Sequence, residues 1–324
     1  MVKLAQIKDH NSRFEGEQHE GNICVFVGAT RGIGAGTLAR MATMIQQSTF
    51  YILGRSPKQA EEQLEALGTS NESNKFIFIE ADVTLLSDVD AACKQIAEAE
   101  QKLDYLCMSA GLVPLNGAEY TKEGLEIAFA LSYYSRMRMV SNLLPLLRQS
   151  PRPRILSVLN GGREQRIDTE DLGLERGWAV RAMINHTTTM TSLAFDHLAS
   201  VNENVAFLHA FPGLVQTNIF SQLTAPESSG IAWRVGLAAI RTLTAVAFFL
   251  MGISTEDSGE RHAFHLTSDT FGPGAHRIDE TSNEVVVPGV LEEYRKEGWP
   301  KKVWEYTLAV FDKVTTIKAT SSRP

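Results

Sequence analysis

The chain has 324 residues, of which 44% are hydrophobic and 21% are charged, as is usual for a soluble globular protein. Its net charge of −7 provides no basic surface, so nucleic acid is not an expected partner. The first 21 residues lack the apolar core of a secretory signal, and the three cysteines have neither disulfide-framework nor metal-ligand spacing. We therefore expect a reducing, cytoplasmic location and no metal site.

Short apolar runs alternate with helical stretches along the chain. The apolar runs are residues 23–27, 50–53, 76–79, 104–108, 155–159 and 205–210. The helical stretches between them include 57–67, 85–101, 122–148 and 179–200. Runs of this kind suit strands buried on both faces, and their alternation with helices predicts an α/β, doubly wound parallel sheet of the Rossmann type. We expect one such domain over 22–270, an N-terminal segment at 1–21 and a C-terminal extension at 271–324.

The segment VFVGATRGIGAG, residues 25–36, joins the first strand to the first helix. Glycine lets the backbone turn sharply and approach a phosphate closely, and a helix N-terminus offers free N–H groups to it. The Gly-x-x-x-Gly-x-Gly spacing predicts a dinucleotide site, and the alternative is a plain tight turn between strand and helix. The cofactor-binding residues expected in this loop are Gly28, Thr30, Arg31, Gly32, Ile33 and Gly34.

Three further motifs follow later strands at their carboxyl ends, where ligands bind in sheets of this kind. They read ADVT at 81–84, MSAG at 108–111 and FPGLVQT at 211–217. Together with the glycine loop, they resemble the short-chain dehydrogenase/reductase family over roughly residues 22–270. Several segments also resemble reductases of fungal secondary-metabolite pathways. The resemblance implies further cofactor contacts at Asp82, Val83, Ala110, Gly111, Pro212, Gly213, Val215 and Thr217.

The second strand ends in YILGRSPK, which contains no acidic residue to hold the 2′-hydroxyl of an NAD ribose. Arg55 lies in this segment and Arg31 lies in the glycine loop. Two guanidinium groups suit a 2′-phosphate, because arginine can bind phosphate oxygens in pairs. NADP(H) is therefore the expected cofactor, and the alternative is that Arg55 is a solvated loop charge.

The family resemblance implies a catalytic Tyr-x-x-x-Lys pair, a Ser and an Asn, and here all four positions are altered. Counting back from Pro212 places Met183 at the Tyr position and Thr187 at the Lys position. Asn160 stands at the Ser position and Ser132 at the Asn position. No shift of the alignment restores the pair, because residues 135–291 contain no tyrosine and residues 123–295 contain no lysine.

Three residues are candidates to fill the gap, and two of them have a structural alternative. His186 lies beside the Lys position and its imidazole titrates near neutral pH, or it is a structural helix histidine. Asn160 could orient a carbonyl through its amide group. Tyr133 could point into the cleft, or it packs in the core.

The segment 231–252 is strongly apolar, and with the residues before it, from about 225, it is expected to form lid helices over a cleft for an apolar substrate. A membrane-dipping or dimer-packing helix is the alternative. A transmembrane span is not expected, because Arg241 would lie near the middle of the bilayer.

Three functions remain open. The first is an NADPH-dependent reductase acting on an activated acceptor, such as an iminium ion or an enone, that needs no strong general acid. The second is a non-redox isomerase or cyclase on the same scaffold, acting by orientation of its substrate. The third is a non-catalytic NADPH- or metabolite-binding protein. The resemblance also implies a homodimer or homotetramer that pairs through the helix at 179–200.

Overall fold

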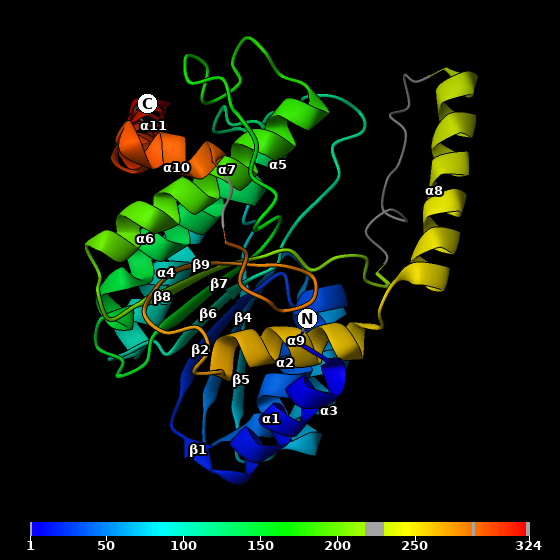
Figure 1. Cartoon of the computed structure of the whole chain (residues 1–324), viewed down its shortest axis with the longest axis vertical. Helices are drawn as coiled ribbons and strands as arrows, with labels where there is room; N and C mark the ends of the chain where they lie inside the picture. The colour runs from blue at the N-terminus through cyan, green and yellow to red at the C-terminus, as the bar shows by residue number, and fades with distance from the viewer. Residues whose placement is uncertain (1, 218–229, 287–288, 322–324) are drawn as a thin grey trace.

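The computed structural model describes residues 2–217, 230–286 and 289–321 (Figure 1). A seven-stranded sheet, in which every pair of neighbouring strands is parallel, forms its centre, with strand order β5-β4-β2-β6-β7-β8-β9. These strands are β2 (Ile23–Val27), β4 (Thr49–Gly54), β5 (Lys75–Glu80), β6 (Tyr105–Met108), β7 (Arg154–Val158), β8 (Ala206–Ala210) and β9 (Gly274–Ile278). A two-residue pairing joins β1 (His19–Glu20) to β3 (Ile45–Gln46) beside this sheet. The predicted doubly wound parallel sheet is confirmed.

Helices cover both faces of the sheet, and each face has its own apolar core. One face packs against α1 (Leu4–Gly16), α2 (Gly32–Met44), α3 (Pro57–Ser70) and α9 (Thr255–Thr267). The other packs against α4 (Leu86–Ala99), α6 (Ser135–Leu147) and α7 (Val180–Ser200). The central strands are almost wholly buried because both faces are covered, which explains their continuous apolar sequences.

The helix expected over 122–148 begins five residues later than its sequence suggests. Tyr120 and Glu126 form an antiparallel bridge, and the Glu126 carboxylate then accepts a hydrogen bond from the N–H of Phe129 at 2.7 Å. The helix runs through α5 (Ile127–Phe129) and a π-helical turn, η1 (Ala130–Tyr134), into α6. A π-turn is rare and is frequently found at functional sites.

The C-terminal extension belongs to the same body as the sheet. It supplies the edge strand β9, which the sequence did not reveal because GAHRI is half polar and too short for a clear apolar run. It then forms α10 (Val290–Lys296) and α11 (Trp299–Ser321), and α11 packs along α7. The Tyr133 hydroxyl lies 2.6 Å from the Thr307 hydroxyl of α11, which ties this helix to η1.

The apolar helix α8 (Ile231–Met251) stands beside the sheet domain, at the right of Figure 1. Its residues Ile231, Val235 and Leu243 are 81%, 63% and 70% exposed, whereas Leu237 is 2% exposed, so in this conformation the described part of α8 leaves much of its apolar surface uncovered. The earlier part of the expected lid, residues 225–229, lies outside the described residues. None of the helices in the described ranges combines the length and hydrophobicity needed to cross a bilayer.

Candidate functional site

A cavity of about 390 Å³ lies at the carboxyl ends of the central strands. The cavity extends from the end of β5, past the ends of β4 and β2, to the end of β6. Parallel sheets bind ligands at this edge, where their strands end. Of the residues expected to bind a dinucleotide, twelve line it: Gly28, Thr30, Arg31, Gly32, Ile33, Gly34, Arg55, Asp82, Val83, Ala110, Gly111 and Thr217. The loops after β2, β4, β5, β6 and β8 thus converge on one cavity.

The glycine loop is packed so closely that no side chain would fit at Gly28 or Gly34. Gly28 has φ +78°, and a Cβ added there would lie 2.6 Å from the backbone N and Cα of Ala110. A Cβ on Gly34 would meet the Ser109 hydroxyl and would lie 2.6 Å from the Gly28 carbonyl oxygen. Gly32, Ile33 and Gly34 of the first turn of α2 line the cavity, and the first N–H groups of a helix have no partner within it, so this cradle fits the pyrophosphate of a dinucleotide.

One end of the cavity, beyond β4, is positively charged. Arg55 and Arg31 both line it, together with Ser56 and Gln59 at the start of α3. Both arginines are exposed, and the guanidinium group of neither forms a hydrogen bond or ion pair with any residue that the structure describes. Asp82, at the end of β5, is engaged locally, because its Oδ1 accepts hydrogen bonds from the Thr84 hydroxyl at 2.8 Å and the Thr84 N–H at 3.1 Å.

The other end, beyond β6, is mainly apolar and carries no titratable side chain among the described residues that line it. The loop Ser109–Leu112, two residues of the α5–η1 segment, Ile127 and Leu131, and the pair Gln216 and Thr217 surround it. Pro212, Gly213 and Val215 do not line the cavity. They shape the approach to Thr217, since Gly213 has φ +67° and Val215 bridges to Ile253.

The positions of the missing Tyr-Lys pair are buried in the protein. Met183 and Thr187, on α7, are 3% and 1% exposed, and neither lines the cavity. The Thr187 hydroxyl donates to the Met183 carbonyl at 2.9 Å, a local helix contact that leaves it no proton to offer a substrate. Ser132, at the Asn position, is also buried and lies within the π-turn η1.

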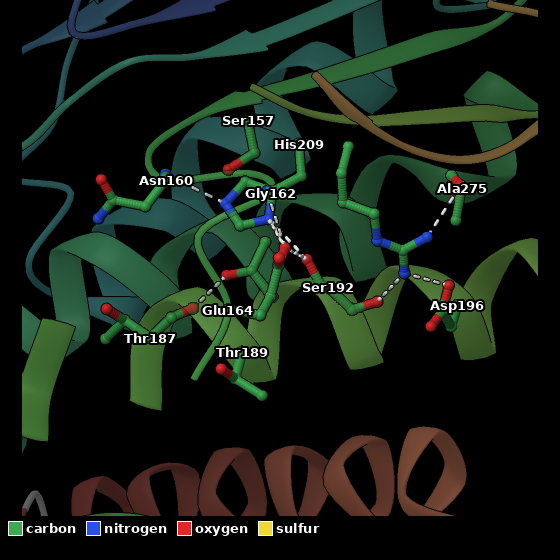
Figure 2. A network of polar contacts seen from close by, with 12 residues as sticks. Ser157, Asn160, Gly162, Glu164, Thr187, Thr189, Ser192, Asp196, His209 and Ala275 are labelled. Atoms are coloured by element: carbon green, nitrogen blue, oxygen red, sulfur yellow. Dashed lines mark hydrogen bonds and ion pairs between the residues drawn. The ribbon is translucent and has the colours of Figure 1, made fainter. Parts of the chain in front are cut away.

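Asn160 follows β7, and a buried polar network holds its backbone in place (Figure 2). Its N–H donates to His209 Nε2 at 3.4 Å, while His209 Nδ1 lies 2.8 Å from the Ser192 hydroxyl. Ser192 donates to Glu164 Oε1 at 2.6 Å, and Glu164 accepts from the N–H of Gly162 at 3.1 Å. Burial, with the nearby charges of two arginines, holds the pKa of His209 well below its ordinary value. The ring is therefore neutral, with its proton on Nδ1.

The Asn160 side-chain amide has no hydrogen-bond partner in the described residues and points away from this network in Figure 2. It does not line the cavity, although it lies on the loop at the end of β7. The amide is free to meet a ligand that extends past β6. Asn160 therefore remains a candidate for contacting the substrate.

The geometry of His186 and Tyr133 favours their structural alternatives. His186 Nε2 accepts from the N–H of Asp168 at 3.0 Å and Nδ1 lies 3.2 Å from the Leu172 carbonyl, so both nitrogens anchor the loop before α7. Burial lowers the pKa of His186. Tyr133 is 0% exposed and its hydroxyl faces Thr307 of α11, away from the cavity. Burial raises the pKa of the Tyr133 hydroxyl above its usual range.

Comparison with known proteins agrees with this arrangement. The family model for short chain dehydrogenases matches residues 22–165. Oxidoreductase AN1596 of Emericella nidulans is 36% identical over 96% of this chain and 98% of its own, and oxidoreductase lepF of Aspergillus flavus is 34% identical over 97% and 98%. The chain belongs to the short-chain dehydrogenase/reductase family. A solved member from Serratia marcescens shares the fold, with 18% identity, a TM-score of 0.59, and coverage of 82% of this chain and 99% of that one.

Within the family site, sequence reasoning missed several residues. Ser109, Ser56 and Gln59 all line the cavity, and Ser109 and Ser56 lie next to Ala110 and Arg55, which the sequence had indicated. Arg136 was also missed. It lies four residues after Ser132, one helical turn away, and this spacing was the available signal. No group of His, Cys, Asp and Glu side chains in the described residues could hold a metal ion.

Proposed function

We propose that this protein is an NADPH-dependent reductase of an apolar natural-product intermediate whose acceptor group is already activated, such as an iminium ion or an enone. The observation that carries the proposal is the contrast between the two ends of the cavity. One end has two unpaired guanidinium groups, and the other has no titratable side chain among the described residues.

The arginine-lined end of the cavity is the evidence for NADP(H) rather than NAD(H). Arg55 and Arg31 lie where the ribose next to the adenine would lie, given that the glycine loop holds the pyrophosphate. Arginine binds phosphate through paired hydrogen bonds, and Ser56 adds a hydroxyl beside it. No acidic residue from the end of β4 lines the cavity, so an NAD ribose would lack its usual partner.

The apolar end supports a substrate that needs no proton from the protein. NADPH, when bound, supplies a hydride to the acceptor. A positioned general acid contributes about 10²–10⁴-fold to the reduction of a simple ketone. An iminium ion already carries positive charge and is neutralised by the hydride alone. An enone takes the hydride at its β-carbon, and the resulting enolate then takes a proton from solvent, so neither acceptor depends on a positioned general acid. Leu112, Ile127 and Leu131 line this end of the cavity and orient an apolar substrate. The similarity to fungal oxidoreductases supports a role in a fungal natural-product pathway.

The test is to incubate the purified protein with a panel of iminium, enone and simple ketone compounds, with and without NADPH. The expected result is NADPH oxidation, with an enone product heavier by two hydrogens and an amine that carries one hydrogen more than the iminium ion. Product formed equally well without nucleotide would overturn the proposal in favour of the isomerase or cyclase. Nucleotide binding without turnover of any compound would favour the non-catalytic binding protein.

The subunit pairing that the family resemblance implies would use α7, yet α11 of the same chain packs on this helix. Arg138 of α6 lies 5.1 Å above the Phe311 ring of α11, so the helix beside α7 contacts α11 as well. We infer that self-association, where it occurs, uses another face of the molecule. Light scattering followed by cross-linking tests this, and a cross-link between the α7 helices of two subunits would overturn it.

A further inference from the structure

A single buried cation lies at the carboxyl ends of β6 and β7. Arg136 of α6 is 2% exposed, and its guanidinium donates to the Ser157 hydroxyl at 2.7 Å and to the Val158 carbonyl at 2.9 Å. It also donates to the Ala110 carbonyl at 2.7 Å, and makes longer contacts with the carbonyls of Met108 at 3.3 Å and Leu131 at 3.4 Å.

All of these partners are neutral. No carboxylate of the described residues forms an ion pair with Arg136, whereas Arg138, two residues later, binds Asp90 at 2.6 Å. Burial lowers the pKa of Arg136 to about 10, so the side chain keeps its charge at neutral pH. The titratable groups near it are the Cys107 thiol of β6 and the His209 ring of β8, and neither is an anion there. A buried charge without an ion partner is costly.

The hydrogen-bond partners of Arg136 show which end of the cavity its charge lies beside. Ala110 and Leu131, whose carbonyls accept from Arg136, both line the end beyond β6. The arginines Arg31 and Arg55 fix the adenosine half of the dinucleotide at the opposite end, and the glycine loop holds its middle. The nicotinamide half is therefore the part of the dinucleotide that extends toward Ala110 and Leu131.

We propose that Arg136 is the fixed positive charge that makes the protein hold NADPH in preference to NADP+. This proposal rests on the proposed function. The nicotinamide ring is neutral in NADPH and positively charged in NADP+, so a nearby buried cation repels the oxidised form while leaving the reduced form unaffected. The protein therefore preferentially binds NADPH, the hydride donor, and releases NADP+, the oxidised nucleotide. Arg136 acts through the electrostatic field of its charge and through its hydrogen bond to the backbone of Ala110. It does not touch the nucleotide and is a positioning residue.

The experiment measures the dissociation constants of NADPH and NADP+ by titration of the full chain. The ratio of the two constants in the wild type is compared with that in Arg136→Met, which removes the charge, and Arg136→Lys, which keeps it. Ser157→Ala removes one hydrogen bond and keeps the charge. Arg138→Met is the matched control, because it removes an arginine from the same helix without touching the cavity. Circular dichroism establishes that each variant is folded.

The wild type is expected to bind NADPH more tightly, and Arg136→Met should reduce this preference about tenfold, which corresponds to about 1.4 kcal/mol. Arg136→Lys, Ser157→Ala and Arg138→Met should keep the preference even where the affinities fall. An equal loss of affinity for both nucleotides in Arg136→Met would overturn the proposal. If that variant does not fold, a wild type that binds NADP+ as tightly as NADPH would overturn it. A wild type that binds neither nucleotide would overturn the proposed function itself.

Discussion

The Ser192 hydroxyl lies 2.8 Å from His209 Nδ1 and 2.6 Å from Glu164 Oε1, at a point where α7, β8 and the loop after β7 meet (Figure 2). Ser192 and His209 are 0% exposed, and Glu164 is 7% exposed. The serine accepts from the imidazole and donates to the carboxylate, so one hydroxyl satisfies two buried groups. His209 in turn accepts from the N–H of Asn160, and Glu164 accepts from the N–H of Gly162. The loop that carries Asn160 is therefore fixed at both ends by one network.

Ser192→Ala is expected to lower the free energy of unfolding by about 1–3 kcal/mol, because it leaves a buried carboxylate and a buried imidazole each short of a partner. Urea denaturation followed by circular dichroism measures the change. Ser200→Ala is the control, since Ser200 is exposed at the end of the same helix and bonds only the nearby His197 carbonyl. Equal stability of the two variants would show that the network contributes nothing to the fold.

Arg55→Ala is expected to weaken NADPH binding about 10- to 100-fold and to leave NADH binding nearly unchanged, because the guanidinium meets only the 2′-phosphate. Fluorescence titration with both nucleotides measures this. Lys58→Ala is the matched control: it removes a positive charge three residues away that does not line the cavity. A parallel loss for NADPH and NADH in Arg55→Ala would contradict the assignment of NADPH.

Much of this site was predictable from the sequence, because glycine motifs and strand ends are local signals. The glycines at 28, 32 and 34 and the residues after β5 and β6 line one cavity, because parallel strands deliver their carboxyl ends to the same edge. The strand β9 and the partners of Arg136 were not predictable. Their roles depend on contacts between segments far apart in the chain, such as Arg136 with Ala110, which are 26 residues apart. The direction in which Tyr133 points was set by α11, which begins more than 160 residues later.

Gly34→Ala is expected to destabilise the protein by about 1–3 kcal/mol and to weaken nucleotide binding at least tenfold. The added Cβ would push α2 away from the Gly28 carbonyl, 2.6 Å from it, and would disturb the phosphate cradle. Gly68→Ala in α3 is the control, because an added Cβ there has no heavy atom within 4 Å. Alanine is about 1 kcal/mol more favourable than glycine inside a helix, so Gly68→Ala should be neutral or stabilising. Normal nucleotide binding by Gly34→Ala would mean that the loop does not hold the phosphates.

Acid is expected to destabilise the fold through His262, a buried histidine on α9. Burial lowers its pKa from 6.5 to about 4, so the folded protein keeps the ring neutral while the unfolded chain binds a proton below pH 6.5. The stability that this ring contributes is present above pH 6.5 and is lost as the pH falls toward about 4, by up to about 1.4 kcal/mol per pH unit. Denaturation at several pH values should show a smaller slope in His262→Gln than in the wild type. Identical slopes would mean that His262 does not remain neutral in the folded state.

Restoring the family pair by the double change Met183→Tyr and Thr187→Lys is expected to destabilise the protein rather than give it a general acid. Both positions are buried in the packing of α7, so the larger tyrosine would overpack its site and the lysine would place an unpaired charge where Thr187 is 1% exposed. These effects cost about 1–3 kcal/mol for overpacking and about 3 kcal/mol or more for the charge. Ile184→Tyr with Arg181→Lys introduces the same residue types at positions on α7 that are exposed, and should be tolerated. Denaturation of both double variants, with assays on a simple ketone, measures the outcome. A stable Met183→Tyr/Thr187→Lys protein that reduced the ketone faster than the wild type would show that these positions still face the substrate.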